Sequence, residues 1–439
     1  MYCPYKNSYL QLTTSVDPKL VNKAVRRAMR KTQIDPHDER PPAQRLTSMQ
    51  PSLYAPWTDI SRARMGFERV GLRTINRNIC SEDSFIQLQA IHSLLDQVQI
   101  SESALFLIDL NIVYRLIKLL EHRDPIVKEK VCLILAHLGN YFQGRTRILS
   151  DPIIIDHLMF LFMRDRKEIR YAAAYCLRQL TRYGCEMISK NEKIIENLLK
   201  VIKNDHVGIV VLHLESLKNL TDWDPVEALK ANGFQVMLEL IEFKDERVVQ
   251  GAMECLRQLC KHSIGKKLAD KYDMTRLLVS YLYCEDLNIV ISTVGLLMYT
   301  TLTTKAKWRL KEFQYQLSKR LVWLCLKKDV PVLQLRAMQV LINMCEVPDC
   351  RNFIKETLDT RIRDIKIRKA DQWDGTTDTK HYGVDIGHLY RTRYVPGAET
   401  IKVCLGDNAE ALNVESYRKR VVATKQRLIH KMNSEPSKN

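Results

Sequence analysis

The sequence predicts an all-α protein in which one helical unit repeats along the chain. The stretch Glu246–Cys260 shows the pattern, because its apolar residues form a single stripe on a helix of about 3.6 residues per turn. The same register fits six further stretches, at steps of 41, 42, 40, 39, 41 and 44 residues. The stripes begin at Ile86, Val127, Ile169, Ile209, Val248, Ile289 and Leu333. Eight residues later stand Leu94, Leu135, Leu177, Leu217, Leu256, Leu297 and Leu341.

A step of about 40 residues is typical of armadillo and HEAT solenoids, where each helical unit buries its stripe against its neighbours. A second apolar segment precedes each stripe, for example Ile153–Met163 and Val236–Phe243. A small connecting element before the second helix would make the unit three-helical, which distinguishes armadillo from HEAT repeats. We therefore expect an armadillo-type right-handed α-solenoid of about seven repeats, with extended basic N- and C-terminal arms. The alternative is an irregular helical domain.

The positive charge of the chain is concentrated at its two ends. The 439 residues include 68 Lys and Arg and 51 Asp and Glu, a net charge of +17. Residues 1–80 hold 14 basic and 6 acidic residues, and residues 351–439 hold 18 and 12. The repeat region is therefore close to neutral, and the basic arms are the parts suited to acidic partners.

Residues 1–60 are expected to form a basic N-terminal arm with a short amphipathic helix at 18–32. Asp17 and Pro18 supply a helix start, and five prolines between Asp35 and Asp59 exclude long helices there. The helix could be a solvated helix lying on the repeats, a docking helix for an acidic surface, a calmodulin-type target or a membrane-surface helix. Its candidate contact residues are Lys23, Arg26, Arg27, Arg30 and Lys31.

Residues 61–350 are predicted to form the solenoid, with a helix at about Ser61–Asn78 covering the first repeat. After Cys350 the register is lost, and residues 351–439 are predicted to be a basic C-terminal extension with a helix near 409–431. The candidate contact residues on that helix are Arg418, Lys419 and Arg420.

The sequence offers little that resembles catalytic or metal-binding chemistry. It contains no Gly-rich phosphate loop, HExxH, GxSxG or CxxC motif. Cysteines such as Cys176 and Cys255 occupy stripe positions, where a thiol behaves as a small apolar group, and His213 is expected to be a satisfied core histidine. We expect a reduced, intracellular protein that is not an enzyme, with no metal, no cofactor, no small-molecule substrate and no membrane span.

One polar position recurs ten residues after each stripe start. On a helix it lies to one side of the stripe, so these side chains are expected to form a row along a partner-binding groove. Asn219, in the segment SLKNL, most resembles the peptide-binding armadillo pattern, but Trp is absent four residues before every member of the row. Ordinary boundary residues are the plainer interpretation. The row consists of Asp96, His137, Gln179, Asn219, Gln258, Tyr299 and Asn343.

Four segments between Pro56 and Cys350 resemble a particular armadillo family. They are Phe67–Ile79 (FERVGLRTINRNI), Gln87–Leu95 (QLQAIHSLL), Leu116–Gly144 and Val294–Lys305 (VGLLMYTTLTTK). The resemblance is to the radial spoke head armadillo-repeat proteins, the rhabdoid tumour deletion region protein family, and covers about two thirds of the chain. Neither arm has a counterpart in that family.

The resemblance implies a non-enzymatic scaffold in the axoneme of motile cilia or sperm flagella, a cytoskeletal location within the cytoplasm. Its expected partners are other radial spoke or axonemal proteins, and the basic arms would suit the acidic surface of tubulin. One alternative is a soluble peptide-binding armadillo adaptor of import or catenin type. Another is nucleic-acid binding through the arms, with a steep salt dependence, although the arms lack aromatic residues interleaved with basic ones in any recognisable module.

Overall fold

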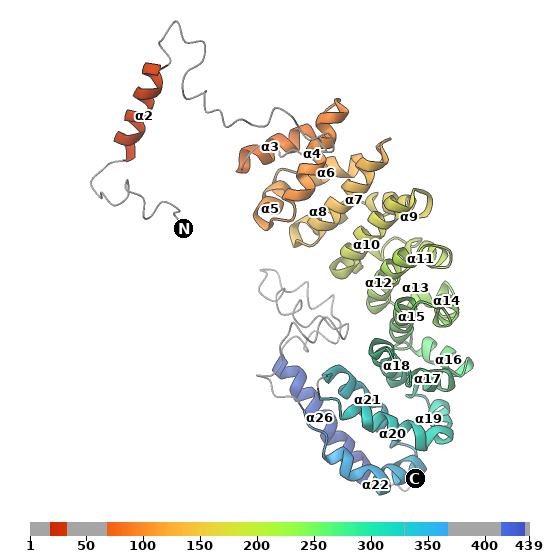
Figure 1. Cartoon of the computed structure of the whole chain (residues 1–439). Coiled ribbons are helices and arrows are strands. Elements are labelled where there is room, and N and C mark those ends of the chain that lie inside the picture. Colours follow the sequence, from red (N-terminus) through yellow and green to blue (C-terminus); the bar gives the residue numbers. More distant parts are fainter. Residues whose placement is uncertain (1–17, 33–67, 329, 368–413, 435–439) are drawn as a thin grey trace. The chain divides into compact units, whose positions relative to one another are not determined.

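The computed structural model describes residues 18–32, 68–328, 330–367 and 414–434, and it divides into two units, Met1–Ile60 and Ser61–Asn439 (Figure 1). In the first unit the described element is helix α2, Pro18–Thr32. The side chains of Lys23, Arg26 and Arg27 are exposed on it, and Val25 is 49% exposed. The side chains of Arg30 and Lys31, and the proline-rich stretch after α2, lie outside the described residues.

The second unit starts at α3, Glu68–Asn78, and is built around helices that carry the predicted stripes. Each of these stripe helices packs against the next one in chain order (Figure 1). All of the leucines predicted eight residues into the stripes are buried, with exposed fractions of 1% or less, so the stacked-helix prediction is confirmed. The stripe helices are α4 (Ser84–Gln97), α7 (Pro125–Gly139), α10 (Lys167–Ile188), α12 (Val207–Trp223), α15 (Glu246–Leu259), α18 (Leu287–Thr300) and α21 (Pro331–Met344).

Two further helices precede most stripe helices, which makes the unit three-helical and the fold an armadillo-type α-solenoid. The short first helices are α5 (Ser101–Asp109), α8 (Phe142–Ser150), α13 (Val226–Lys230), α16 (Ser263–Lys271) and α19 (Thr304–Leu310), the last followed by η3 (Lys311–Phe313). The middle helices are α6 (Ile112–Leu119), α9 (Ile154–Arg164), α11 (Ile194–Ile202), α14 (Gly233–Ile241), α17 (Met274–Tyr281) and α20 (Gln314–Cys325). Before α11, Gly184 breaks the helical geometry inside α10, and the residues after it stand where other units have a short helix.

Aspartate caps explain where several stripe helices begin. Asp83, Asp124, Asp245 and Asp286 each stand three residues before a stripe start, and each side chain accepts a hydrogen bond from the backbone N–H two residues later. A capping carboxylate accepts a hydrogen bond from an otherwise unpaired N–H of the first turn. Its negative charge is also stabilised by the positive end of the helix dipole. The repeat therefore specifies the start of the helix as well as its buried face.

The C-terminal helices pack on the end of the stack. Helix α22 (Pro348–Arg363) follows α21, and α26 (Val414–Asn433) packs against both. Lys425 Nζ donates to the carbonyl oxygens of Arg363 and Ile365 at 2.7 and 2.9 Å, and Val421, Leu428 and Met432 of α26 join the core. The described residues after Cys350 therefore belong to the same packed unit as the stripe helices, with α26 next to α21.

His213 lies in the core on α12, but the expectation that it is satisfied was wrong. Its side chain is fully buried against the ring of Phe162, with centroids 4.9 Å apart, and neither ring nitrogen has a hydrogen-bond partner. Burial lowers the pKa of His213 from its ordinary value of 6.5 to about 4, although the charge of Asp205 acts in the opposite direction. The imidazole is therefore neutral in the folded protein at neutral pH.

The pKa of His213 predicts an acid-sensitive core. Because the unfolded chain binds the proton near pH 6.5 and the folded chain near pH 4, stability is full above pH 6.5 and falls as the pH drops through this window. We expect His213 to account for a loss of about 2 kcal/mol in the free energy of unfolding between about pH 7.5 and pH 5. Urea unfolding of wild type and of His213→Leu at both pH values measures this loss in the free energy of unfolding. An equal pH dependence in the two proteins would contradict the prediction.

Candidate functional site

The predicted polar row lies along the stripe helices, but its members differ in accessibility. Asp96 is exposed, and His137, Asn219 and Tyr299 are partly buried, with burial lowering the pKa of His137. Gln179, Gln258 and Asn343 are buried, with exposed fractions of 9%, 4% and 2%. The structure therefore places only part of the row where a ligand could reach it.

Two members of the row bond to the preceding stripe helix. The amide of Asn343 donates to Thr301 Oγ1 at 2.9 Å and to the Met298 carbonyl oxygen at 3.1 Å. The amide of Asn219 donates to Thr181 Oγ1 at 3.4 Å. In both cases an amide ten residues into one stripe meets a threonine twelve residues into the preceding stripe. Asn219 and Asn343 therefore brace adjacent helices.

A second set of side chains on the stripe helices carries charge, and we refer to it as the charged face. It was not singled out in the sequence because its members have no common residue type, although most recur six or nine residues into a stripe. They are only partly buried, and they come from α10, α12, α15 and α21. The charged face consists of Arg178, Glu215, Lys218, Glu254, Arg257 and Arg336.

Ion pairs within and between helices order the charged face. Arg178 of α10 pairs with Glu215 of α12. On α15, Arg257 Nη2 lies 2.7 Å from Glu254 Oε2, and Arg336 Nη1 of α21 lies 3.4 Å from Glu254 Oε1. Arg336 thus spans α18, and Nη1 also donates to the Ile291 carbonyl oxygen of that helix at 2.8 Å.

Gly295 makes the crossing of Arg336 possible. A Cβ atom at Gly295 would lie 2.7 Å from Arg336 Nη1 and 3.0 Å from Arg257 Cδ. The glycine leaves the space above α18 in which the two guanidinium groups approach Glu254. A residue with any side chain would push at least one of them away, since these separations are shorter than van der Waals contact.

Glu254 is the electrostatic centre of the charged face. Its side chain is 16% exposed, and those of Arg257 and Arg336 are each 13% exposed. Burial acts to raise the pKa of Glu254, but the charges of Arg257, Arg336 and Lys218 outweigh it and hold the pKa well below its usual range. The carboxylate is therefore ionised in the folded protein at any physiological pH.

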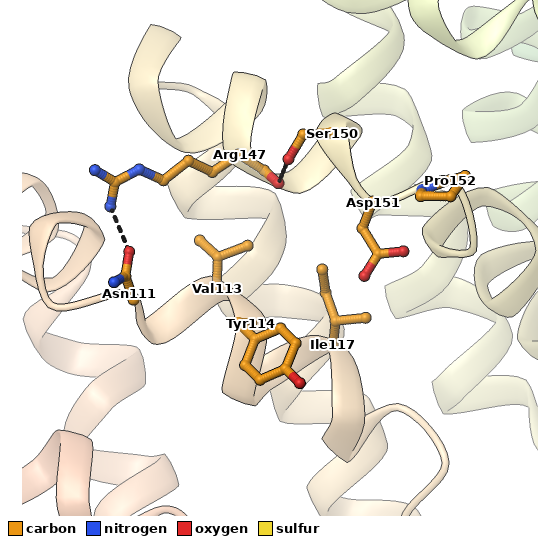
Figure 2. Close-up of a pocket in the computed structure, with 8 residues that line it drawn as sticks. All are labelled: Asn111, Val113, Tyr114, Ile117, Arg147, Ser150, Asp151 and Pro152. Atoms are coloured by element: carbon orange, nitrogen blue, oxygen red, sulfur yellow. Dashed lines mark hydrogen bonds between the residues drawn. The ribbon is translucent and has the colours of Figure 1, made fainter.

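Two adjoining surface pockets lie on α6, at the other end of the unit. The first has a volume of about 570 Å³ and is lined by residues of α6, α8 and the turn after α8 (Figure 2). In it Arg147 Nη1 donates to Asn111 Oδ1 at 3.3 Å, as Figure 2 shows. The second, of about 800 Å³, shares Asn111 and Tyr114 with the first. Tyr114, which lines both pockets, is 61% exposed, and Lys118 Nζ lies 4.3 Å from the centroid of its ring.

The basic residues predicted as contacts in the C-terminal arm fall on α26. Lys419 and Arg420 are exposed, and the side chain of Arg418 lies outside the described residues. With Lys23, Arg26 and Arg27 of α2, the structure leaves five of the predicted basic contacts accessible.

The described residues present little reactive chemistry. Burial raises the pKa of Cys176, Cys255 and Cys260 to about 12, so these thiols stay protonated and unreactive. Within residues 18–32, 68–328, 330–367 and 414–434, no three His, Cys, Asp or Glu side chains are grouped so that they could hold a metal ion. In the same part of the chain, none of the helices combines the length and apolarity that crossing a membrane requires.

Of the solved structures named below, the first supports the fold. An engineered protein is matched with a TM-score of 0.59 at 17% sequence identity, over 83% of this chain and 89% of that chain. A designed armadillo repeat protein in complex with the peptide (KR)4 is 12% identical and covers 52% of this chain and 99% of its own, with a TM-score of 0.49. Computationally designed armadillo repeat proteins for modular peptide recognition are 14% identical, with a TM-score of 0.48, over 52% of this chain and 98% of that chain. Neither a family model nor a curated protein matches the sequence.

Proposed function

We propose that this chain is a non-enzymatic scaffold that binds a segment of another protein along the charged face. The observation that carries the proposal is the continuity of that face, which runs from Arg178 on α10 to Arg336 on α21 across successive stacked helices. An extended polypeptide can meet several helices at once, whereas a compact small molecule contacts one or two. A solenoid is suited to such ligands because its repeats form one long surface.

The alternation of charge on this face favours a protein partner of mixed charge. Arg178, Lys218 and Arg257 alternate with Glu215 and Glu254, so a polyanion such as nucleic acid would meet two carboxylates along the same path. Fixed, partly buried charges mainly supply specificity, since a partner with misplaced charges brings like charges together on this face. We infer that the charged face selects a partner whose charges follow one another in the complementary order.

At a finer level, we propose that the scaffold works in the axoneme of cilia or sperm flagella as a radial spoke component. This proposal is supported by the resemblance of Phe67–Ile79, Gln87–Leu95, Leu116–Gly144 and Val294–Lys305 to that family. The exposed basic side chains of α2 and α26 suit an acidic neighbour such as tubulin.

Two measurements test the two levels separately. The tagged protein, expressed in ciliated or spermatogenic cells, should be found along the axoneme; diffuse cytosolic or nuclear signal would refute the axonemal role. Proximity labelling of the same cells should recover a partner set that is lost in Lys218→Glu and kept in Lys305→Glu, an exposed lysine on α19. An unchanged partner set in Lys218→Glu would refute binding along the charged face, wherever the protein is located.

A further inference from the structure

The outer face of α20 carries three exposed apolar side chains and one lysine that are not part of the core. Tyr315, Lys319, Trp323 and Leu326 follow one another at spacings of four, four and three residues, so they share one side of the helix. Tyr315 is 58% exposed, Trp323 46% and Leu326 42%. At about 1.5 Å of rise per residue, the stripe extends for roughly 17 Å. We refer to these four residues as the α20 stripe.

The preceding repeat adds a further aromatic ring beside the α20 stripe. Arg320 lies between the rings of Tyr283, which follows α17, and Trp323, with its guanidinium carbon 5.2 and 4.3 Å from their centroids. Hydrogen bonds to the backbone fix the guanidinium, because Nε and Nη2 donate to the Leu282 carbonyl oxygen at 3.0 and 2.8 Å. On the other side, the Tyr315 ring meets Phe353 of α22 edge to face at 4.7 Å. These aromatic rings are therefore fixed in place before any partner arrives.

Positive charge is in excess around the α20 stripe. Helix α20 contains Lys319 and Arg320 and no acidic residue, and Lys327 and Lys328 follow it directly. Two nearby carboxylates are already paired, Glu312 with Arg276 at 3.1 Å and Asp349 with Lys311. The surface therefore combines fixed aromatic rings with an excess of cations.

We propose that the α20 stripe, together with Tyr283, is a second docking surface that binds an acidic segment of a partner protein bearing apolar side chains. Rigid, half-exposed aromatic rings bury area on binding at a small cost in conformational entropy, and Tyr, Trp and Arg are the residue types that dominate binding energy at protein interfaces. Carboxylates of the partner would pair with Lys319 and Lys328. The α20 stripe lies on a middle helix, so it is separate from the charged face of the stripe helices and its occupation does not depend on that face.

The geometry at Trp323 favours a protein over a nucleic acid. Arg320 and Lys327 both lie over the indole ring, each 4.3 Å from its centroid. Nucleic-acid-binding aromatics need an open ring face on which a base can stack. Here cations of the chain already lie over the ring, and the Trp323 side chain, 46% exposed, remains available for contact with apolar side chains.

The experiment is a selection from a random 15-residue peptide display library with the full-length chain as bait, followed by binding of the enriched peptides. The variants are Trp323→Ala and Lys319→Glu, and the matched controls are Trp308→Ala, an exposed tryptophan on α19, and Lys305→Glu on the same helix. We expect acidic peptides with Leu, Phe or Trp to be enriched, and we expect each variant to weaken their binding by about tenfold or more while the controls leave it unchanged. Circular dichroism of each variant verifies that the helices are intact.

Three results would overturn the proposal. The first is that no acidic peptide is enriched, and the second is that the enriched peptides bind both variants as tightly as wild type. The third is that a 20-nucleotide oligouridine, or vesicles containing phosphatidylserine, bind in a Trp323-dependent manner while acidic peptides do not. Peptides whose binding is lost in Lys218→Glu and kept in Trp323→Ala would instead belong to the charged face, so the two proposals fail independently.

Discussion

Substitution of Gly265 by alanine is expected to lower the free energy of unfolding by about 3 kcal/mol or more, because the added methyl group would collide with rigid backbone. Gly265 lies in the first turn of α16, where this short helix crosses the end of α15. A Cβ atom there would lie 2.0 Å from the Leu259 carbonyl oxygen and 2.6 Å from its carbon. A side-chain neighbour could rotate away, but a carbonyl within the last turn of a helix cannot. The two helices must therefore move apart, which opens the core between them.

The repeat contains a matched site and a matched control for this prediction. Gly144 stands at the same register position, 17 residues into the preceding stripe of Val127, and its Cβ would lie 2.2 Å from the Leu138 carbonyl oxygen. Gly144→Ala should therefore be similarly destabilising. Gly208 on α12 has nothing within 4 Å of an added Cβ, so Gly208→Ala should be neutral or stabilising by up to about 1 kcal/mol.

Urea unfolding monitored by circular dichroism, with hydrogen exchange to locate the weakened helices, measures all three glycine variants. Because each repeat contacts only its neighbours, the loss of protection in Gly265→Ala should be largest in α15 and α16. Equal stabilities for Gly265→Ala and Gly208→Ala would show that the crossing of α15 and α16 is looser than the structure indicates.

Substitution of Glu254 by alanine is expected to cost about 3 kcal/mol, because it leaves two largely buried guanidinium groups without their counter-charge. Arg257 and Arg336 are both 13% exposed and both pair with this one carboxylate. The same unfolding measurement applies. A loss below about 1 kcal/mol would mean that the three side chains are solvated like an ordinary surface ion pair.

The crossing over Gly295 allows this network to be tested a second way. In wild type, Gly295→Ala should be destabilising, since the new Cβ would displace Arg336. In an Arg336→Met background the same change should be stabilising by up to about 1 kcal/mol, because alanine favours a helix interior over glycine. A reversal of sign between the two backgrounds is the expected outcome, and equal effects in both would contradict the proposed crossing.

The buried stripes could be predicted because each one depends on a single short segment. The first twelve residues of a stripe define the buried face of their helix, whatever that helix packs against. The charged face was not predictable, because Glu254 and Arg336 are 82 residues apart with α18 between their helices, and no local period links them. Gly295 is informative only once Arg336 is seen to pass over it. The same holds for the α20 stripe, since Trp323 and Leu326 are indistinguishable in sequence from residues of a buried face.

The predicted polar row shows the limit of register arguments. Its members lie on the stripe helices, but the accessibility of each one depends on the neighbouring helix. Asn343 is buried because Thr301 and the Met298 carbonyl of α18 lie within hydrogen-bond distance, whereas Asp96 on α4 is exposed. The packing of neighbouring repeats therefore determines which of these residues a ligand can reach.

The placement of α26 has a consequence for how the chain is made. Almost every other inter-helix contact joins segments synthesised about one repeat apart, so those helices can assemble in order as they emerge from the ribosome. Helix α26 meets α22 through Lys425 and Arg363, which are 62 residues apart in the chain. The apolar flank of α21 that α26 covers therefore stays exposed during synthesis until a segment about 70 residues further along the chain has been made.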